Sequence, residues 1–135
     1  MTLVDSNVLI DFLADDPLWS EWSIQRLREA VDRGSLLIND VIYAEVSAGF
    51  LKLDDFEAAL ATIGVTVAPL PRAALFLAGK AFVQYRRAGG TRTGVLPDFF
   101  IGAHAEVESL TLLTRDPRKY QIYFPSVRLI TPDLG

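Results

Sequence analysis

The chain has 135 residues, of which 50% are hydrophobic and 22% are charged, values typical of one folded domain with its own core. It contains no cysteine, which excludes disulfides, zinc–thiolate centres and thiol catalysis. The net charge is −4, but residues 1–71 hold 4 basic and 12 acidic side chains, whereas residues 72–135 hold 9 basic and 5 acidic ones. A polyanion could therefore dock on the second half, although uneven surface charge also arises by chance.

The N-terminus does not match a secretory signal, because Asp5 interrupts its apolar run. The longest uncharged stretch, residues 58–71, has 14 residues and contains Gly64, Pro69 and Pro71. Such a stretch is too short and too broken to cross a bilayer. We therefore expect a soluble, cytoplasmic protein without a membrane partner.

Short apolar runs alternate with helix-like segments along the chain. In chain order the pattern predicts a strand at 2–5, helices at 6–13 and 19–33, a strand at 36–38, helices at about 40–51 and 54–63, a strand at 65–67, a helix at 71–88, a loop at 89–94, a helix at 98–109, and strands at 111–114 and 127–130. Alternation of this kind favours a parallel sheet with helices on both faces. The fold prediction is a single α/β domain spanning residues 1–135.

Four acidic residues fall at positions where a parallel sheet could bring them together. Asp5 follows the first strand, Asp116 follows the strand at 111–114, Asp98 opens a helix, and Glu45 borders the apolar stripe of another helix. The carboxyl ends of parallel strands share one edge, where ligands bind in such sheets. Clustered carboxylates repel one another unless a cation lies among them, and Mg²⁺ or Mn²⁺ is the natural hard partner.

Each acid also has an ordinary structural explanation. Asp5 and Asp116 could cap the helices or turns that follow them, and Asp98 could simply complement a helix dipole. Glu45 taken alone is more typical of a half-exposed surface residue. The small residues Gly102 and Ala105 share a helix face with Asp98 and could admit another backbone or a bulky ligand.

The single histidine, His104, is a weaker candidate for catalysis. It lies six residues after Asp98, which turns it about 120° away from that carboxylate on a helix. We expect it on a packed or partner-facing surface. The glycine-rich stretch at 89–94 is not a phosphate-binding P-loop, because no Gly-Lys-Ser/Thr follows it.

The motifs together resemble those of a known family. Asp5-Ser6-Asn7-Val8-Leu9-Ile10, Glu45 within its helix, the segment from Pro97-Asp98 to Ala105, and Leu113-Thr114-Arg115-Asp116 are similar to PIN-domain ribonucleases. The resemblance is nearest to the toxins of VapBC-type toxin–antitoxin systems and covers essentially the whole chain. Two positions depart from the usual pattern: Asn39 stands where many relatives carry Ser or Thr, and Lys119 where an acidic residue or His is frequent.

The resemblance implies a PIN-like three-layer fold, with a central parallel sheet between helices, and an acidic pocket that holds one or two Mg²⁺ or Mn²⁺ ions. It implies Asp5, Glu45, Asp98 and Asp116 as the catalytic acids, with Ser6, Asn7 and Thr114 in support. It also implies endonucleolytic cleavage of RNA, a cognate antitoxin, and dimerisation in many members.

For the metal, we expect Asp5 and Asp98 to be direct ligands, with Asp116 and Glu45 completing the shell or orienting water. Basic residues of the second half are expected around the RNA backbone, where they would neutralise phosphates: Arg115 first, then Arg118, Arg92 and Arg86, with Lys80, Arg87 and Lys119 as further candidates.

Two other functions remain open from the sequence. One is a PIN-like module that binds RNA or a protein without cutting. The other is a receiver-type or phosphoryl-transfer α/β domain, which would need a pair of acids after the first strand and a lysine after the last. The acids here are spread over four segments, and the last strand is followed by Thr131-Pro132-Asp133. The nuclease prediction is the better match.

Overall fold

Five parallel strands form the centre of the molecule. The computed structural model describes residues 1–92 and 94–132. The strands are β1 (Thr2–Val4), β2 (Leu36–Ile38), β3 (Val65–Val67), β4 (Thr111–Leu113) and β5 (Leu129–Ile130). They lie in the order β3-β2-β1-β4-β5, and all neighbouring pairs are parallel. The predicted parallel sheet is therefore confirmed.

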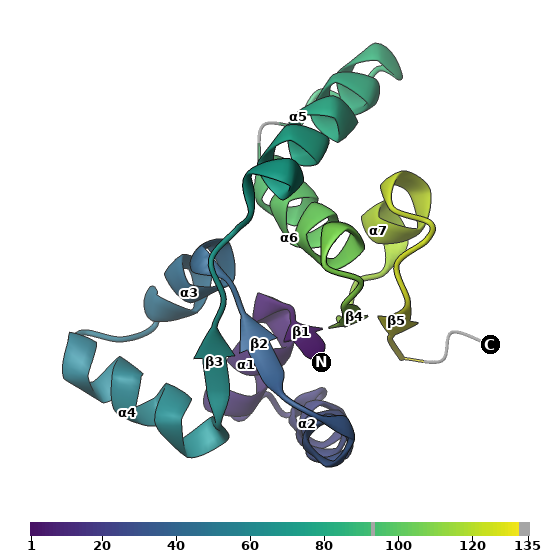
Figure 1. Cartoon of the computed structure of the whole chain (residues 1–135). Coiled ribbons are helices and arrows are strands. Elements are labelled where there is room, and N and C mark those ends of the chain that lie inside the picture. The colour runs from purple at the N-terminus through teal and green to yellow at the C-terminus, as the bar shows by residue number, and fades with distance from the viewer. Residues whose placement is uncertain (93, 133–135) are drawn as a thin grey trace.

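Seven helices connect these strands within the described residues. They are α1 (Ser6–Leu13), α2 (Ser20–Arg33), α3 (Asp40–Ser47), α4 (Leu53–Ile63), α5 (Arg72–Arg87), α6 (Leu96–Val107) and α7 (Arg118–Tyr123). In Figure 1, α5, α6 and α7 gather on one side of the sheet, while α1 and α2 lie on the other. This is the expected three-layer α/β fold. No helix in the described part of the chain is both long and apolar enough to cross a membrane.

Several predicted boundaries were wrong. The helix expected at about 40–51 ends at Ser47, because Gly49 and Phe50 turn back onto the carbonyls of Val46 and Ser47. The strand expected at 127–130 is only Leu129–Ile130. Helix α7 was not predicted at all, since six residues after a proline show no clear helical period.

An aromatic cluster fixes the start of α6 in the core. Phe99 is fully buried and packs against Tyr123 and Phe124 of the α7 region, with ring centroids 5.0 and 6.2 Å away. It also contacts Phe82 and Tyr85 of α5 at 6.3 and 5.8 Å. Edge-to-face pairs of this kind each contribute about 0.5–1.5 kcal/mol beyond their buried area. Because Asp98 is the preceding residue, this cluster also fixes its backbone.

Candidate active site

The polar residues that end the central strands lie at one edge of the sheet. Asp5 follows β1, Asn39 follows β2 and Thr114 follows β4, and these three strands are adjacent. The order of connections reverses between β1 and β4, which is the switch point where ligands bind in open parallel sheets. The backbone N–H of Asp5 donates to the Leu113 carbonyl at 2.9 Å, so β1 and β4 stay paired up to this edge.

A small cavity of about 70 Å³ opens at this edge of the sheet. Its lining comes from the starts of three helices and the loop after β4, and consists of Asp5, Ser6, Asn7, Asp98, Asp116, Lys119 and Tyr120. Three of the four predicted acids therefore meet in one cavity. The fourth, Glu45, does not line it but is linked to it through Ser6.

Asp5 is the buried anchor of the cavity, with only 4% of its surface exposed. Its Oδ1 accepts the backbone N–H of Ser6 at 2.8 Å, so Asp5 caps α1 as well as lining the cavity. Its Oδ2 accepts two hydroxyl donors, from Thr114 at 2.7 Å and Tyr120 at 2.9 Å. Burial raises the pKa of Asp5 against the lowering effect of these hydrogen bonds, and the nearby Asp98 charge raises it further.

Glu45 is exposed on α3, which agrees with its description from the sequence as a surface residue. Its Oε1 nevertheless accepts the Ser6 hydroxyl at 2.9 Å, across 39 residues of sequence. Its pKa is raised, first by partial burial, which outweighs the Ser6 hydrogen bond, and then by the charges of Asp5 and Asp98. Glu45 therefore belongs electrostatically to the acid group, although it stands outside the cavity lining.

Asp98 lies in the first turn of α6 and forms an ion pair with Lys119, with Nζ 2.7 Å from Oδ2. About a third of each side chain is exposed, 30% for Lys119 and 33% for Asp98. The glycine below Asp98 does not admit a ligand. A Cβ at Gly102 would lie 2.4 Å from the ring of Phe124, so this small residue serves packing within the chain. The expectation of an open small-residue face was wrong here.

Asp116 lies in the exposed loop between β4 and α7, directly before the Pro117 that opens the helix. Its backbone N–H donates to the Thr114 hydroxyl at 3.1 Å. Asn7 holds the same loop, because its Oδ1 accepts the Arg115 backbone N–H at 3.1 Å and its Nδ2 donates to Thr114 Oγ1 at 3.4 Å. Ser6, Asn7 and Thr114 thus all contact the acids or the loop that carries them.

Tyr120 is a residue of this site that the sequence analysis missed. Its side chain is 2% exposed, and its hydroxyl donates to Asp5. Burial, followed by the charges of Asp5 and Asp98, raises the pKa of Tyr120 well above 10, which keeps the hydroxyl protonated as a donor. It lies on α7, 115 residues from Asp5, so no local pattern indicates the contact. In the sequence, only its position next to Lys119, where many relatives carry an acidic residue or His, could have drawn attention to it.

The predicted RNA-contacting arginines lie in different settings. Arg115 is paired with Asp11, its Nε 2.8 Å from Oδ2 and its Nη2 3.0 Å from Oδ1, and its guanidinium lies 5.1 Å from the Trp19 ring centroid. Arg86 lies 5.2 Å from the Phe82 ring centroid. Arg118 opens α7 and is exposed, and so is Arg92. Two of the four adjoin a cavity residue in sequence: Arg115 precedes Asp116, and Arg118 precedes Lys119.

The donor chemistry of the cavity fits a divalent ion. Asp5, Asp98 and Asp116 offer carboxylate oxygens, the ligands that Mg²⁺ and Mn²⁺ prefer. Burial first, and then the charges of neighbouring acids, raise the pKa of Asp5 and Glu45, and a cation would relieve the repulsion between these charges. Within residues 1–92 and 94–132, however, no three acidic or histidine side chains already converge as a ready-made metal site. Binding an ion therefore requires side-chain adjustment.

His104 is buried in the packing between α6 and α3, as expected, and does not line the cavity. Asn39 caps α3 by accepting the Ile42 N–H on its Oδ1 at 3.0 Å, so its Nδ2 faces His104 Nδ1 at 3.1 Å as a donor. The ring is therefore neutral, with its proton on Nε2. Burial lowers the pKa of His104, which agrees with a neutral ring.

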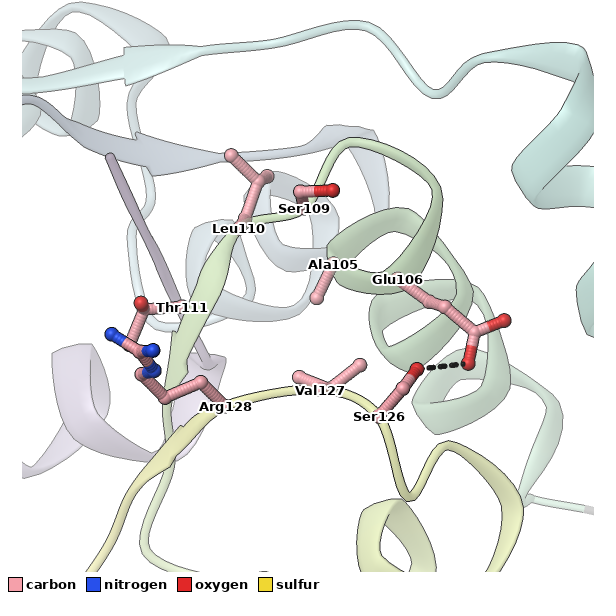
Figure 2. Close-up of a pocket in the computed structure, with 8 residues that line it drawn as sticks. All are labelled: Ala105, Glu106, Ser109, Leu110, Thr111, Ser126, Val127 and Arg128. Carbon is pink, nitrogen blue, oxygen red and sulfur yellow. Dashed lines mark hydrogen bonds between the residues drawn. The ribbon is translucent and has the colours of Figure 1, made fainter.

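A second hollow lies at the opposite edge of the sheet, where β4 and β5 begin (Figure 2). It has a volume of about 420 Å³ and is lined in part by Glu106, Ser126 and Arg128. Ser126 donates to Glu106 at 2.9 Å, and Figure 2 shows Arg128 on the other side of the hollow. None of the predicted site residues lines it.

Comparison with known proteins identifies a family that matches the sequence and solved structures that share the fold. The profile of the PIN domain matches residues 2–125. No curated protein matches the chain in sequence. Among solved structures, VapBC2 from Rickettsia felis, bound to a promoter DNA fragment, is similar with a TM-score of 0.75 and 17% identity over 98% of both chains.

Two further solved structures are similar at the same level. VapBC-1 from nontypeable Haemophilus influenzae has a TM-score of 0.72 and 19% identity, with 96% of both chains covered. FitAcB from Neisseria gonorrhoeae has a TM-score of 0.68 and 19% identity, again with 96% of both chains covered. At such identities these likenesses concern the fold.

Proposed function

The chain belongs to the PIN domain family, and from this premise we propose that it is a metal-dependent endoribonuclease, the toxin of a type II toxin–antitoxin pair. The observation that carries the proposal is the convergence of Asp5, Asp98 and Asp116 from three separate segments on one cavity. The cavity lies at the switch point of the sheet, where parallel α/β folds bind ligands.

Asp5, Asp98 and Asp116 are the proposed ligands of one or more Mg²⁺ or Mn²⁺ ions. When bound, such an ion would lower the pKa of a coordinated water and stabilise negative charge on the phosphate. The chain itself supplies the positioning. Thr114 and Tyr120 hold one oxygen of Asp5 and Ser6 holds the other, while Glu45, anchored by the Ser6 hydroxyl, is placed to orient water beside the cavity.

RNA contacts are proposed for the basic residues of the second half. Arg118 is the strongest candidate, because it is exposed and precedes Lys119 of the cavity. Arg92 and Arg86 are assigned to more distant backbone contacts. Arg115 can contact RNA only through the part of its guanidinium that is not bonded to Asp11. Each phosphate contact should make binding weaker as salt rises.

An antitoxin is the proposed protein partner, since the similar structures include VapBC complexes. A groove of about 520 Å³ between α1 and α3 offers it an apolar surface that borders Glu45. Ile10 lines this groove and is 44% exposed. In co-purification with the cognate antitoxin, Ile10→Glu should break the complex, whereas Ile122→Glu, at an exposed position outside the groove, should not.

Homodimerisation is also proposed, with the exposed Leu75, Phe76 and Val83 of α5 as the contact surface.

The test is cleavage of total cellular RNA by purified, antitoxin-free protein with Mg²⁺, with Mn²⁺ and with chelator. Asp98→Asn should lower the cleavage rate by about 100-fold or more, because even the partners of metal ligands contribute about 10–100-fold. Asp55→Asn is the matched control. Asp55 is likewise the third residue of its helix, α4, but it is exposed and outside the cavity.

Three outcomes separate the possibilities. Metal-dependent fragments from wild type and Asp55→Asn, but not from Asp98→Asn, support the nuclease. Equal cleavage by all three proteins indicates a contaminant and contradicts the assignment of the site. RNA binding without cleavage by wild type favours the alternative of a non-cleaving module, for which the absence of a ready-made metal site in the described residues is the one supporting observation.

A further inference from the structure

Lys119 places a positive charge inside the acidic cavity. Its Nζ lies 2.7 Å from Asp98 Oδ2, and its side chain lines the cavity together with Asp5 and Asp116. It is the only cation that pairs with one of the four acids in the described part of the chain. Arg115, nearby in sequence, is turned to Asp11 instead. One tethered charge therefore faces the whole group of carboxylates.

The acids need more positive charge than this lysine provides. Asp5 has all of its short contacts with neutral donors: the Ser6 N–H and the hydroxyls of Thr114 and Tyr120. Glu45 likewise accepts only a hydroxyl. Within the cavity, the carboxylates of Asp5, Asp98 and Asp116 thus share one ammonium, and Glu45 adds its charge from outside the lining. One divalent ion added to that ammonium would neutralise the three cavity carboxylates, whereas two divalent ions would leave a surplus of two positive charges.

The size of the cavity favours one ion as well. Its volume is about 70 Å³, and a site for one water needs on the order of 10–15 Å³, so it holds only a handful of waters. A single Mg²⁺ with near-octahedral coordination uses most of that room. A second divalent ion within about 5 Å of a fixed ammonium would also be repelled strongly enough to weaken its binding by about 100-fold or more.

We propose that the ammonium of Lys119 serves as the second cation of the active site, so that the cavity binds a single divalent ion. This rests on the proposed function, which assigns Asp5, Asp98 and Asp116 to a metal. Lys119 is then a built-in charge that competes with a further ion at Asp98. The residue acts through the carboxylates and the phosphate charge, and its effect on metal binding is measurable without RNA.

The experiment counts Mn²⁺ ions bound per chain by titration, with free Mn²⁺ followed by electron paramagnetic resonance and no RNA present. Wild type and Lys119→Arg should bind one ion. Lys119→Met should bind a second ion, or bind the first at least about tenfold more tightly, because the competing charge is gone. Lys52→Met, which removes the same charge from an exposed site outside the cavity, should match wild type.

Two ions bound by wild type, or an unchanged titration in Lys119→Met, would overturn the proposal. Asp98→Asn separates this failure from that of the proposed function. If Asp98→Asn loses binding while Lys119→Met equals wild type, the metal site stands and the role of Lys119 falls. If wild type binds no Mn²⁺, both fall. Circular dichroism and the unfolding midpoint confirm that the variants are folded, as expected for a side chain that is one third exposed.

Discussion

Two aspartate ion pairs, Asp11 with Arg115 and Asp98 with Lys119, differ in whether carboxylate oxygen atoms stay free to bind a ligand. Asp11 on α1 is 3% exposed, receives two nitrogens of Arg115 and the Ser23 hydroxyl at 3.1 Å, and lies under a guanidinium that also faces Trp19. Asp98 on α6 has one contact to a flexible lysine, with both side chains about a third exposed. The first pair is saturated and joins α1, α2 and the loop after β4. The second keeps oxygens available to a ligand.

This difference shows that residue type and position in a helix do not by themselves identify a functional acid. Asp11 and Asp98 are both helical aspartates paired with a cation from residues 115–119. Only the second has spare coordination capacity and a cavity in front of it. The structural role of Asp11 and the ligand role of Asp98 can therefore be separated by experiments on stability and on metal binding.

Replacement of the two aspartates should have clearly unequal consequences for stability, and the loss at Asp11 is the largest expected effect on folding. Asp11→Asn should lower the free energy of unfolding by about 2 kcal/mol, because a buried acceptor of charge-assisted hydrogen bonds is lost. Asp98→Asn should change it by no more than about 0.5 kcal/mol. Urea unfolding of both variants measures the difference. Equal losses would mean that the Asp98 pair is structural too.

A smaller effect is expected at the hydroxyl that supports Asp5. Tyr120→Phe removes one donor from Oδ2 and leaves Thr114 in place. We expect a loss of about 1 kcal/mol of stability, typical of one hydrogen bond. Because the Tyr120 bond lowers the pKa of Asp5, its removal should raise that pKa further. Mn²⁺ binding should then weaken at a higher pH in Tyr120→Phe than in wild type, and coincident pH profiles would contradict this role.

The smallest effect is on the pH dependence of stability without metal. The pKa values of Asp5 and Glu45 are raised in the folded chain, chiefly by burial. The folded state then binds protons more readily than the unfolded state just above the ordinary carboxyl range, so stability should rise as pH falls from neutral into that window. Thermal unfolding in chelator measures this trend. Glu45→Gln should flatten it, whereas Glu57→Gln, at an exposed position of α4, should not.

Much of the fold could be predicted from the sequence, because the signals are local. Apolar triplets such as Leu36–Ile38 marked the strands, and Asn39 marked the start of α3, where it caps the helix as expected. The ends were harder. Helix α7 has six residues and depends on the burial of Tyr120 and on the packing of Phe124 against Gly102 of α6, tertiary effects that no short window contains.

The acids of the site were predictable because strand ends and helix starts share one edge in a parallel sheet. Their partners were not. The contacts Tyr120–Asp5 and Arg115–Asp11 join residues 115 and 104 positions apart. Arg115 shows that a residue next to site residues in sequence need not point into the site. It follows Thr114 and precedes Asp116, yet its guanidinium pairs with Asp11. Packing sets the direction of its side chain.

The contact between Asn39 and His104 has a consequence for sequence variation within the family. Serine or threonine at position 39 could also cap α3, but one hydroxyl oxygen would then have to accept the Ile42 N–H and donate to His104, contacts that Asn39 makes through two separate atoms. From a shorter side chain this double contact would weaken the hydrogen bond to the buried imidazole nitrogen. Relatives that lack the asparagine should therefore also lack the histidine, so the two positions should be inherited as a pair.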